Sequence, residues 1–267
     1  MKNYILLWAG CLYWVPASFA QLSPGARLAA TGNQKAAVND IWAVEANPAG
    51  FGSMTRPAFQ LSYHQYFLAK ELRRQAFAFA VPFGKSITGF YLRNEGIPEY
   101  QDLQAGWVLA RTFGTRFSIG IRSNFYRLHI PEYGTSSSLS IDVGSFYQLN
   151  DKISLGLYID NLSKSLPINR SALPVSRTCY AGIAYMLHHK VLMAGTLTFR
   201  EKTNPQYAVG IDYMLSEQFS IRSGLNIAPI SHHMGLGIKR ATFNLDAAFI
   251  MQTSSGYSSL ISLGYAF

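Results

Sequence analysis

The sequence predicts an all-β fold, a transmembrane antiparallel β-barrel of about fourteen strands. Of its 267 residues only 14% are charged, while 14% are aromatic and 49% are hydrophobic. An ordinary soluble domain has roughly 25% charged residues. The mean hydropathy is only +0.07, and beyond residue 20 polar residues interrupt every apolar stretch, usually at every second position. A barrel needs this alternation because one strand face meets lipid and the other meets water, whereas helical membrane proteins carry uncharged runs of about 18 residues or more.

Residues 1–20 are expected to be a cleaved signal peptide. Lys2 supplies the positive start, residues 4–15 form an apolar core, and small residues precede the expected cleavage after Ala20. A lipoprotein signal with an acylated Cys11 is one alternative, although the apolar core continues past that cysteine. A retained anchor is another, although the segment is short for a membrane span. The signal predicts export to the cell outer membrane.

Residues 57–267 are the expected barrel domain. They divide into stretches of about ten residues that alternate with period two, as tilted transmembrane strands do. In 152–161, for example, Leu155 and Leu157 share one face while Gly156 and Tyr158 share the other. The expected strands are 57–69, 74–82, 85–93, 104–113, 116–128, 137–148, 152–161, 176–187, 190–201, 205–215, 218–227, 231–239, 241–252 and 257–267.

The connections predict the topology of the barrel. Short turns such as Phe83-Gly84 alternate with longer connections over 94–103, 129–136 and 162–175. Bacterial barrels alternate short periplasmic turns with longer outer loops in the same way. Both ends of the barrel domain are therefore expected on the periplasmic side.

The last strand ends on Tyr265 and Phe267, which share the lipid-facing register. This ending resembles the C-terminal signal that the outer-membrane assembly machinery reads, so membrane lipid and that machinery are expected partners. A soluble β-sandwich is the alternative fold. It also alternates, but its outward face would carry more charge than these strands have on either face.

Residues 21–56 do not alternate and are expected to form a plug. They are rich in small residues, with a helical turn expected over 38–46, where Asp40 can cap the start. Barrels of about eight strands are filled by side chains and those of sixteen or more enclose a channel, so fourteen strands leave a lumen that a compact segment can fill. A flexible periplasmic leader is the alternative.

Two short motifs in this segment carry a family resemblance. They are Gly25-Ala26-Arg27 and, after Asn39-Asp40-Ile41-Trp42-Ala43-Val44, the turn Asn47-Pro48-Ala49-Gly50. The segment resembles the N-terminal signature of the PorV/PorQ family of Bacteroidota outer-membrane proteins. That family is similar to the long-chain fatty-acid transporters, which have fourteen strands and an N-terminal hatch ending in an Asn-Pro-Ala turn. The sequence departs from the family at Thr31-Gly32, where Met-Gly is common, and at Glu45-Ala46, where an aromatic pair is common.

Seven charged residues fall in the inward register of the expected strands. We expect them to form a lumenal charge network that holds barrel and plug together, with a lining for a solute path as the alternative. They are Arg122, Asp142, Asp160, Arg200, Asp212, Arg222 and Asp246.

No catalytic motif is present, so no enzyme activity and no cofactor are expected. Neighbours on a strand point to opposite faces, so neither His188-His189 nor His232-His233 is expected to share a metal. Cys179 would be the single mature cysteine, which excludes an intramolecular disulfide. The net charge is +9, but the basic residues are scattered, so nucleic-acid binding is not expected.

The resemblance implies a role in protein export by type IX secretion, as a shuttle or scaffold subunit that binds the translocon or its cargo. The hatch resemblance implies the alternative, a transporter of hydrophobic small molecules in which ligand passes by rearrangement near Asn47-Pro48-Ala49-Gly50 and leaves through the wall. A barrel with no transport role is the third reading.

Overall fold

The computed structural model describes residues 25–37, 39–51, 54–69, 71–97, 99–164, 166–168, 176–201, 203–253 and 256–267. The expected signal peptide, 1–20, lies outside the described residues. No helix among those described is long and apolar enough to cross a membrane.

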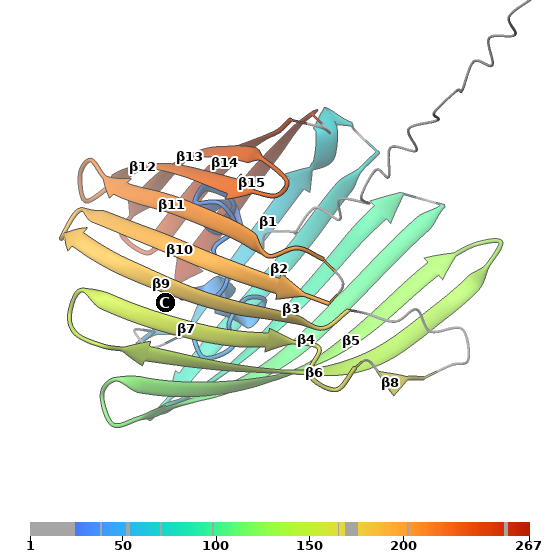
Figure 1. The fold of residues 1–267 in the computed structure, drawn as a ribbon, viewed down its shortest axis with the longest axis horizontal. Helices are drawn as coiled ribbons and strands as arrows, with labels where there is room; N and C mark the ends of the chain where they lie inside the picture. Colours follow the sequence, from blue (N-terminus) through green and yellow to red (C-terminus); the bar gives the residue numbers. More distant parts are fainter. Residues whose placement is uncertain are drawn as a thin grey trace, which may run out of the picture.

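Fourteen long antiparallel strands form one closed sheet (Figure 1). Each pairs with the next along the chain, and the first and last strands pair with each other over eight residues, from Ala58 with Ala266 to Gln65 with Ser259. The barrel prediction is therefore confirmed. A two-residue strand, β8, adds to the edge of β6. The strands are β1 (Ala58–Gln65), β2 (Arg73–Phe83), β3 (Ser86–Ile97), β4 (Tyr100–Phe113), β5 (Phe117–Ile130), β6 (Gly134–Gln148), β7 (Ile153–Asp160), β8 (Leu166–Pro167), β9 (Thr178–His188), β10 (Val191–Arg200), β11 (Gln206–Met214), β12 (Phe219–Ile227), β13 (Ser231–Arg240), β14 (Phe243–Gln252) and β15 (Gly256–Ala266).

The strands present large apolar side chains outward and small or polar ones inward. On β4, Trp107 and Leu109 face out with 65% and 55% of their surface exposed, while Val108 and Ala110 are buried inside. Because lipid and lumen demand opposite polarities, the alternation in the sequence fixes which face of each strand turns inward.

Two expected outer loops are largely strand. The expected loop over 94–103 is occupied by β3, which continues to Ile97, and by β4, which starts at Tyr100. The expected loop over 129–136 likewise shrinks to a turn after Ile130. These stretches are polar and lack clear alternation, but the backbone hydrogen bonds of the ladder continue through them regardless. Of the third loop, 162–175, residues 165 and 169–175 lie outside the described residues.

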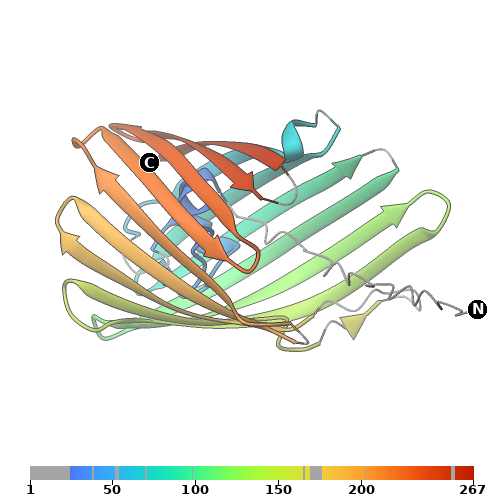
Figure 2. The same cartoon turned by 45° about the horizontal axis from the view of Figure 1, so that its top comes forward.

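The wall is uneven in height. Strands β4, β5 and β6 have 14, 14 and 15 residues, whereas β7 has 8 and β11 and β12 have 9 each. Figure 2 shows the β5–β6 hairpin reaching well past the strands opposite. The excess lies at the end of the barrel away from Phe267, which we call the far end; the other we call the Phe267 end.

At the Phe267 end the last strand joins the first through an aromatic cluster. The backbone N–H of Phe267 donates to the carbonyl of Pro57 at 2.9 Å. The ring of Tyr265 lies 5.0 Å from that of Phe267 and 6.0 Å from that of Phe59. These outward aromatics stabilise the seam where the barrel closes.

Candidate functional site in the barrel interior

The described part of the N-terminal segment, 25–37 and 39–51, lies inside the barrel, drawn in blue in Figures 1 and 2. It contains one helical turn, α1 (Ala26–Ala30), and a 3-10 turn, η1 (Ile41–Val44). As expected, Asp40 caps the second turn, since its side chain accepts from the Trp42 N–H. The first turn was not expected, although its Ala-Arg-Leu-Ala-Ala sequence favours a helix.

Glycines that face the interior allow this segment to pack closely against the barrel wall. A β-carbon built on Gly210 or Gly224 would overlap the backbone of Thr31, and one built on Gly120 would overlap that of Pro48. Similar overlaps arise around the lumen at Gly89, Gly144, Gly156, Gly182 and Gly235. At Gly120, Gly156, Gly210 and Gly224 backbone therefore lies against backbone, which only glycine permits, whereas the other four glycines make room for side-chain atoms of the segment.

The first turn is fixed to β13–β15. The Ala26 N–H donates to Ser262 Oγ at 2.9 Å, and the Ala29 carbonyl lies 2.7 Å from His233 Nδ1. Ala26, Ala29 and Ala30 pack with Ala248, Ile250 and Leu260 in a dry cluster. The N-terminal motif Gly25-Ala26-Arg27 thus places small residues where the wall is close, and Gly25 faces the indole of Trp42.

The Asn47-Pro48-Ala49-Gly50 turn is fixed to β5 and β6. Asn47 is fully buried, and its Nδ2 donates to the Ala36 carbonyl at 2.7 Å and to the Ser145 carbonyl at 2.9 Å. Its Oδ1 accepts from the Ala49 N–H at 3.0 Å. One side chain therefore joins two stretches of the segment to the wall and closes the turn.

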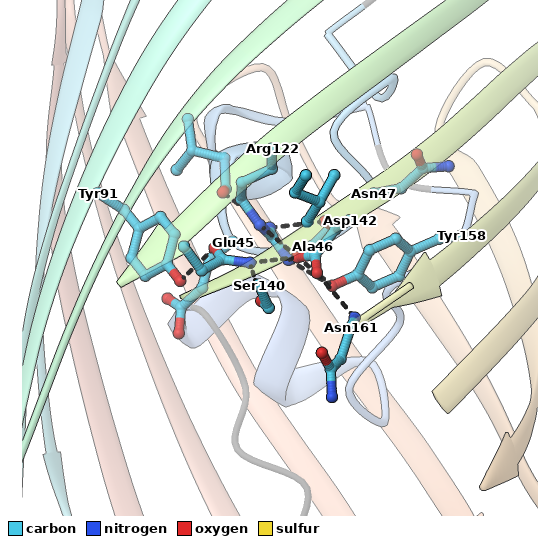
Figure 3. A network of polar contacts seen from close by, with 12 residues as sticks. Glu45, Ala46, Asn47, Tyr91, Arg122, Ser140, Asp142, Tyr158 and Asn161 are labelled. Atoms are coloured by element: carbon cyan, nitrogen blue, oxygen red, sulfur yellow. Dashed lines mark hydrogen bonds and ion pairs between the residues drawn. The ribbon is translucent and has the colours of Figure 1, made fainter. Parts of the chain in front are cut away.

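A buried ion pair between neighbouring strands lies beside this turn (Figure 3). Arg122 Nε donates to Asp142 Oδ2 at 2.8 Å, while Arg122 Nη1 donates to the carbonyls of Val44 and Ala46 at 2.8 and 3.0 Å. Asp142 also accepts from Asn124 Nδ2 at 2.7 Å and from the Asn161 N–H at 2.8 Å. The charges are thus paired and hydrogen-bonded, which buried charges require.

A second group of charges lies under the first turn. Arg222 contacts Asp246 at 2.6 Å and Asp212 at 3.1 Å. Arg27 reaches Asp212 at 3.1 Å and Asp40 at 3.0 Å, which joins the segment to β11. Burial opposes the charge of Arg27, but these two carboxylates outweigh it and raise its pKa.

A third group of buried charges was not expected from the sequence. Glu45 pairs with Arg74 and, at 2.8 Å, with Arg93. Burial acts to raise the pKa of the Glu45 carboxyl, but the two arginines outweigh it, and the pKa lies below its usual value. The inward register of both arginines was the available signal, and their partner in the N-terminal segment could not be read from strand alternation.

Two of the expected network residues are left outside these ion pairs, although one of them, Asp160, lies near the Arg122–Asp142 pair. Asp160 and Arg200 face inward but form none of the ion pairs found among the described residues. His232 is exposed and His233 is buried inside, as expected. The expectation of opposite faces is wrong for His188 and His189, whose rings lie 3.8 Å apart, because the second of them already belongs to the turn after β9. No group of three metal-ligating side chains occurs in the described chain.

Two cavities are stacked along β10 and β11. The larger, about 250 Å³, opens at the Phe267 end and is lined by Thr31, Gln34, Ala194 and Gly210 among others. The smaller, about 30 Å³, lies on the far side of the segment. Its lining includes Asn33, Thr196, Thr198, Ala208 and Asn226. The strip 31–34 lies between them, with Gln34 Oε1 accepting from Thr196 Oγ1 at 2.6 Å.

Neither protein-family models nor curated protein sequences match this chain. Solved structures do. CymD, a monoaromatic hydrocarbon channel, has a TM-score of 0.72 and 12% identity, covering 92% of this chain and 98% of its own. The Ralstonia pickettii toluene transporter TbuX has a TM-score of 0.70 and 11% sequence identity, and the match covers 91% of this chain and 98% of TbuX. A Pseudomonas aeruginosa FadL homologue has a TM-score of 0.65 and 11% sequence identity, and the match covers 91% of this chain and 98% of the homologue. At such identities the likeness shows a shared fold.

Proposed function

We propose that this chain is an outer-membrane transporter of hydrophobic small molecules, and that residues 25–51 act as its plug. The observation that carries the proposal is the pair of stacked cavities separated, in the described chain, by the strip 31–34. The barrel fold shared with a toluene transporter and a hydrocarbon channel supports it.

The strip 31–34 is the part of the plug that we expect to move. On one side the plug is held by the Arg27 ion pairs, and on the other by Arg122 and by Glu45 with its two arginines. Within the strip, Gly32 and Asn33 both have left-handed backbone with φ of 82° and 61°. We therefore place the rearrangement here rather than at Asn47–Gly50, where Asn47 is tied on three sides.

A lipid-facing groove beside the larger cavity supports an exit for the transported molecule through the barrel wall. A groove of about 500 Å³ lies on the lipid-facing side of β9–β13, and Ala194 and Gly210 line both this groove and the larger internal cavity. Backbone and one methyl group are what separate the two spaces at these residues. Tyr185, Met193 and Leu225 give the groove an apolar surface.

Uptake by whole cells tests this function. Cells with a lipopolysaccharide outer membrane that express the chain are expected to take up radiolabelled toluene faster than cells carrying a barrel of unrelated function at equal expression. Uptake of a polar solute such as glucose should be unchanged. Equal toluene uptake in both strains contradicts the proposal.

Protein export by type IX secretion is the second candidate. The N-terminal motifs support it, and so does the raised β5–β6 hairpin, whose tip exposes 84% of Tyr133. Native mass spectrometry of the protein from its own membrane separates the two functions. Stoichiometric co-purification with a translocon or secreted cargo favours export, whereas a lone barrel carrying a bound apolar molecule favours transport.

A further inference from the structure

We propose that the cavity at the Phe267 end binds compact apolar molecules that carry a protonated amine. The inference rests on the proposed function, because it names the polar group that a transported molecule would present on the periplasmic side. The cavity has a volume of about 250 Å³ and lies between the first turns of the plug and strands β7–β11. That is close to the lower end of the range for ligand sites, so it suits a single-ring molecule.

One wall of the cavity is apolar. Leu28 of the plug faces Ala184 and Met186 of β9 and Leu192 and Ala194 of β10 across the space. Met186 is only partly buried and has a flexible thioether chain, so it can adapt to the shape of a ring. This wall would hold the apolar body of the ligand.

The lining of the cavity also includes a carboxylate oxygen that has no hydrogen-bond partner in the described chain. Asp212 lines the cavity, and its side chain is only 9% exposed. Its Oδ2 contacts both Arg27 and Arg222, each at 3.1 Å, whereas its Oδ1 is buried and has no hydrogen-bond partner among the residues that the structure describes. An ionised carboxylate only accepts hydrogen bonds, so the group that satisfies Oδ1 must be a donor. Leaving such an oxygen unpaired is costly, and a ligand that pairs it gains that energy.

The charges around the cavity favour a cation. Its lining carries three carboxylates, Asp40, Asp151 and Asp212, against two basic groups, Arg27 and Lys152. The difference is one negative charge, and the guanidinium of Arg27 is already shared between Asp40 and Asp212. An ammonium group therefore completes the balance, while a carboxylate would meet repulsion.

The ligand series benzylamine, toluene and phenylacetate tests the inference on the purified protein by isothermal titration calorimetry at pH 7. The three share one ring and differ in charge. We expect benzylamine to bind about tenfold tighter than toluene, as a charge-assisted hydrogen bond provides, and phenylacetate to bind least. Equal affinities, or tighter binding of phenylacetate, would overturn the inference.

Two matched pairs of variants place the site. Met186→Trp fills the cavity and should abolish benzylamine binding, whereas Met193→Trp points to lipid from the neighbouring strand and should leave it unchanged. Asp212→Asn should weaken benzylamine binding about tenfold without weakening toluene binding. Glu217→Gln likewise removes one carboxylate, from an exposed turn outside the cavity lining, and should have little effect. If Asp212→Asn does not fold, the inference is tested by the ligand series together with the Met186→Trp and Met193→Trp variants.

The binding result and the transport result can fail separately. Tight benzylamine binding in a protein that gives no toluene uptake would refute the proposed transport and keep the site. Uptake of toluene with no preference for benzylamine in the calorimeter would refute the site and keep the transporter.

Discussion

Arg122 and Asp142 are directly opposite partners in the β5–β6 ladder, and the same guanidinium that pairs with the carboxylate donates to two carbonyls of the N-terminal segment, those of Val44 and Ala46. A wall ion pair is thus also the attachment of the interior segment. The arrangement recurs at Asp212 and Arg222, opposite partners in the β11–β12 ladder. There the carboxylate, rather than the arginine, reaches the segment, through Arg27.

Replacement of Arg122 by Met should destabilise the protein strongly. It leaves the fully buried Asp142 without its cationic partner, and breaking a buried pair in this way costs about 3–5 kcal/mol. The measurement is urea unfolding of the detergent-solubilised protein, followed by the gel shift between folded and boiled forms. Arg111→Met, on the exposed outer face of β4, is the control and should change stability by less than about 0.5 kcal/mol. Equal stabilities of the two variants would show that the ion pair is not structural.

Replacement of Gly144 by Leu should displace the segment and open the lumen. A side chain there meets Asn47 and Pro48, whereas Gly195 on β10 faces outward and has no atom closer than 3.8 Å to a β-carbon built on it. In planar bilayers, Gly144→Leu is expected to raise ion conductance several-fold over wild type, and Gly195→Leu to leave it unchanged. An unchanged conductance in both would argue that the segment does not limit ion flow.

Lys35 should make stability depend on pH. Burial lowers the pKa of its ammonium group from 10.5 to about 8, against the attraction of Asp160 and Glu45. Its ammonium lies 5.6 Å from the centre of the Tyr180 ring. Between pH 8 and 10.5 the unfolded chain binds this proton and the folded chain does not, so stability should rise with pH across that window. Below pH 8 both states hold the proton, and the contribution stays flat.

The measurement is the melting temperature from pH 7 to 10.5 for wild type and Lys35→Met, because the difference between the curves removes the titration of other groups. As pH rises, we expect the melting temperature of the wild type to increase relative to that of Lys35→Met. Parallel curves would mean that Lys35 titrates normally.

The strands of the barrel wall and the direction in which their side chains point could be predicted from the sequence, because apolar and polar or small residues alternate along each strand. In β12, Ile221 and Leu225 face out while Arg222 and Gly224 face in, as their alternation requires. That signal weakens where the strands are polar on both sides, so the sequence does not distinguish the ends of β3 and β4 near Ile97 from a loop.

Contacts inside the barrel were much less predictable. Inward arginines are evident from register, but whether Arg74 pairs with a wall carboxylate or with Glu45 depends on the path of a segment that has no periodicity. The inward glycines are a sequence signal for these contacts. Gly120 and Gly144 are paired across β5 and β6, and such a pair marks a place where another backbone comes close.

If this chain transports hydrophobic molecules as proposed, the strip 31–34 must leave the wall for a molecule to pass. A Gln34→Cys, Thr196→Cys variant in a Cys179→Ser background, bridged by a short bis-methanethiosulfonate linker, ties that strip to β10, where the two native side chains lie 2.6 Å apart. The matched bridge, Ala26→Cys with Ser262→Cys, ties the first turn to β15, where we expect no movement. We expect the first bridge to abolish toluene uptake by cells until a reductant is added, and the second to leave uptake intact. Full uptake through the Gln34–Thr196 bridge would contradict this expectation.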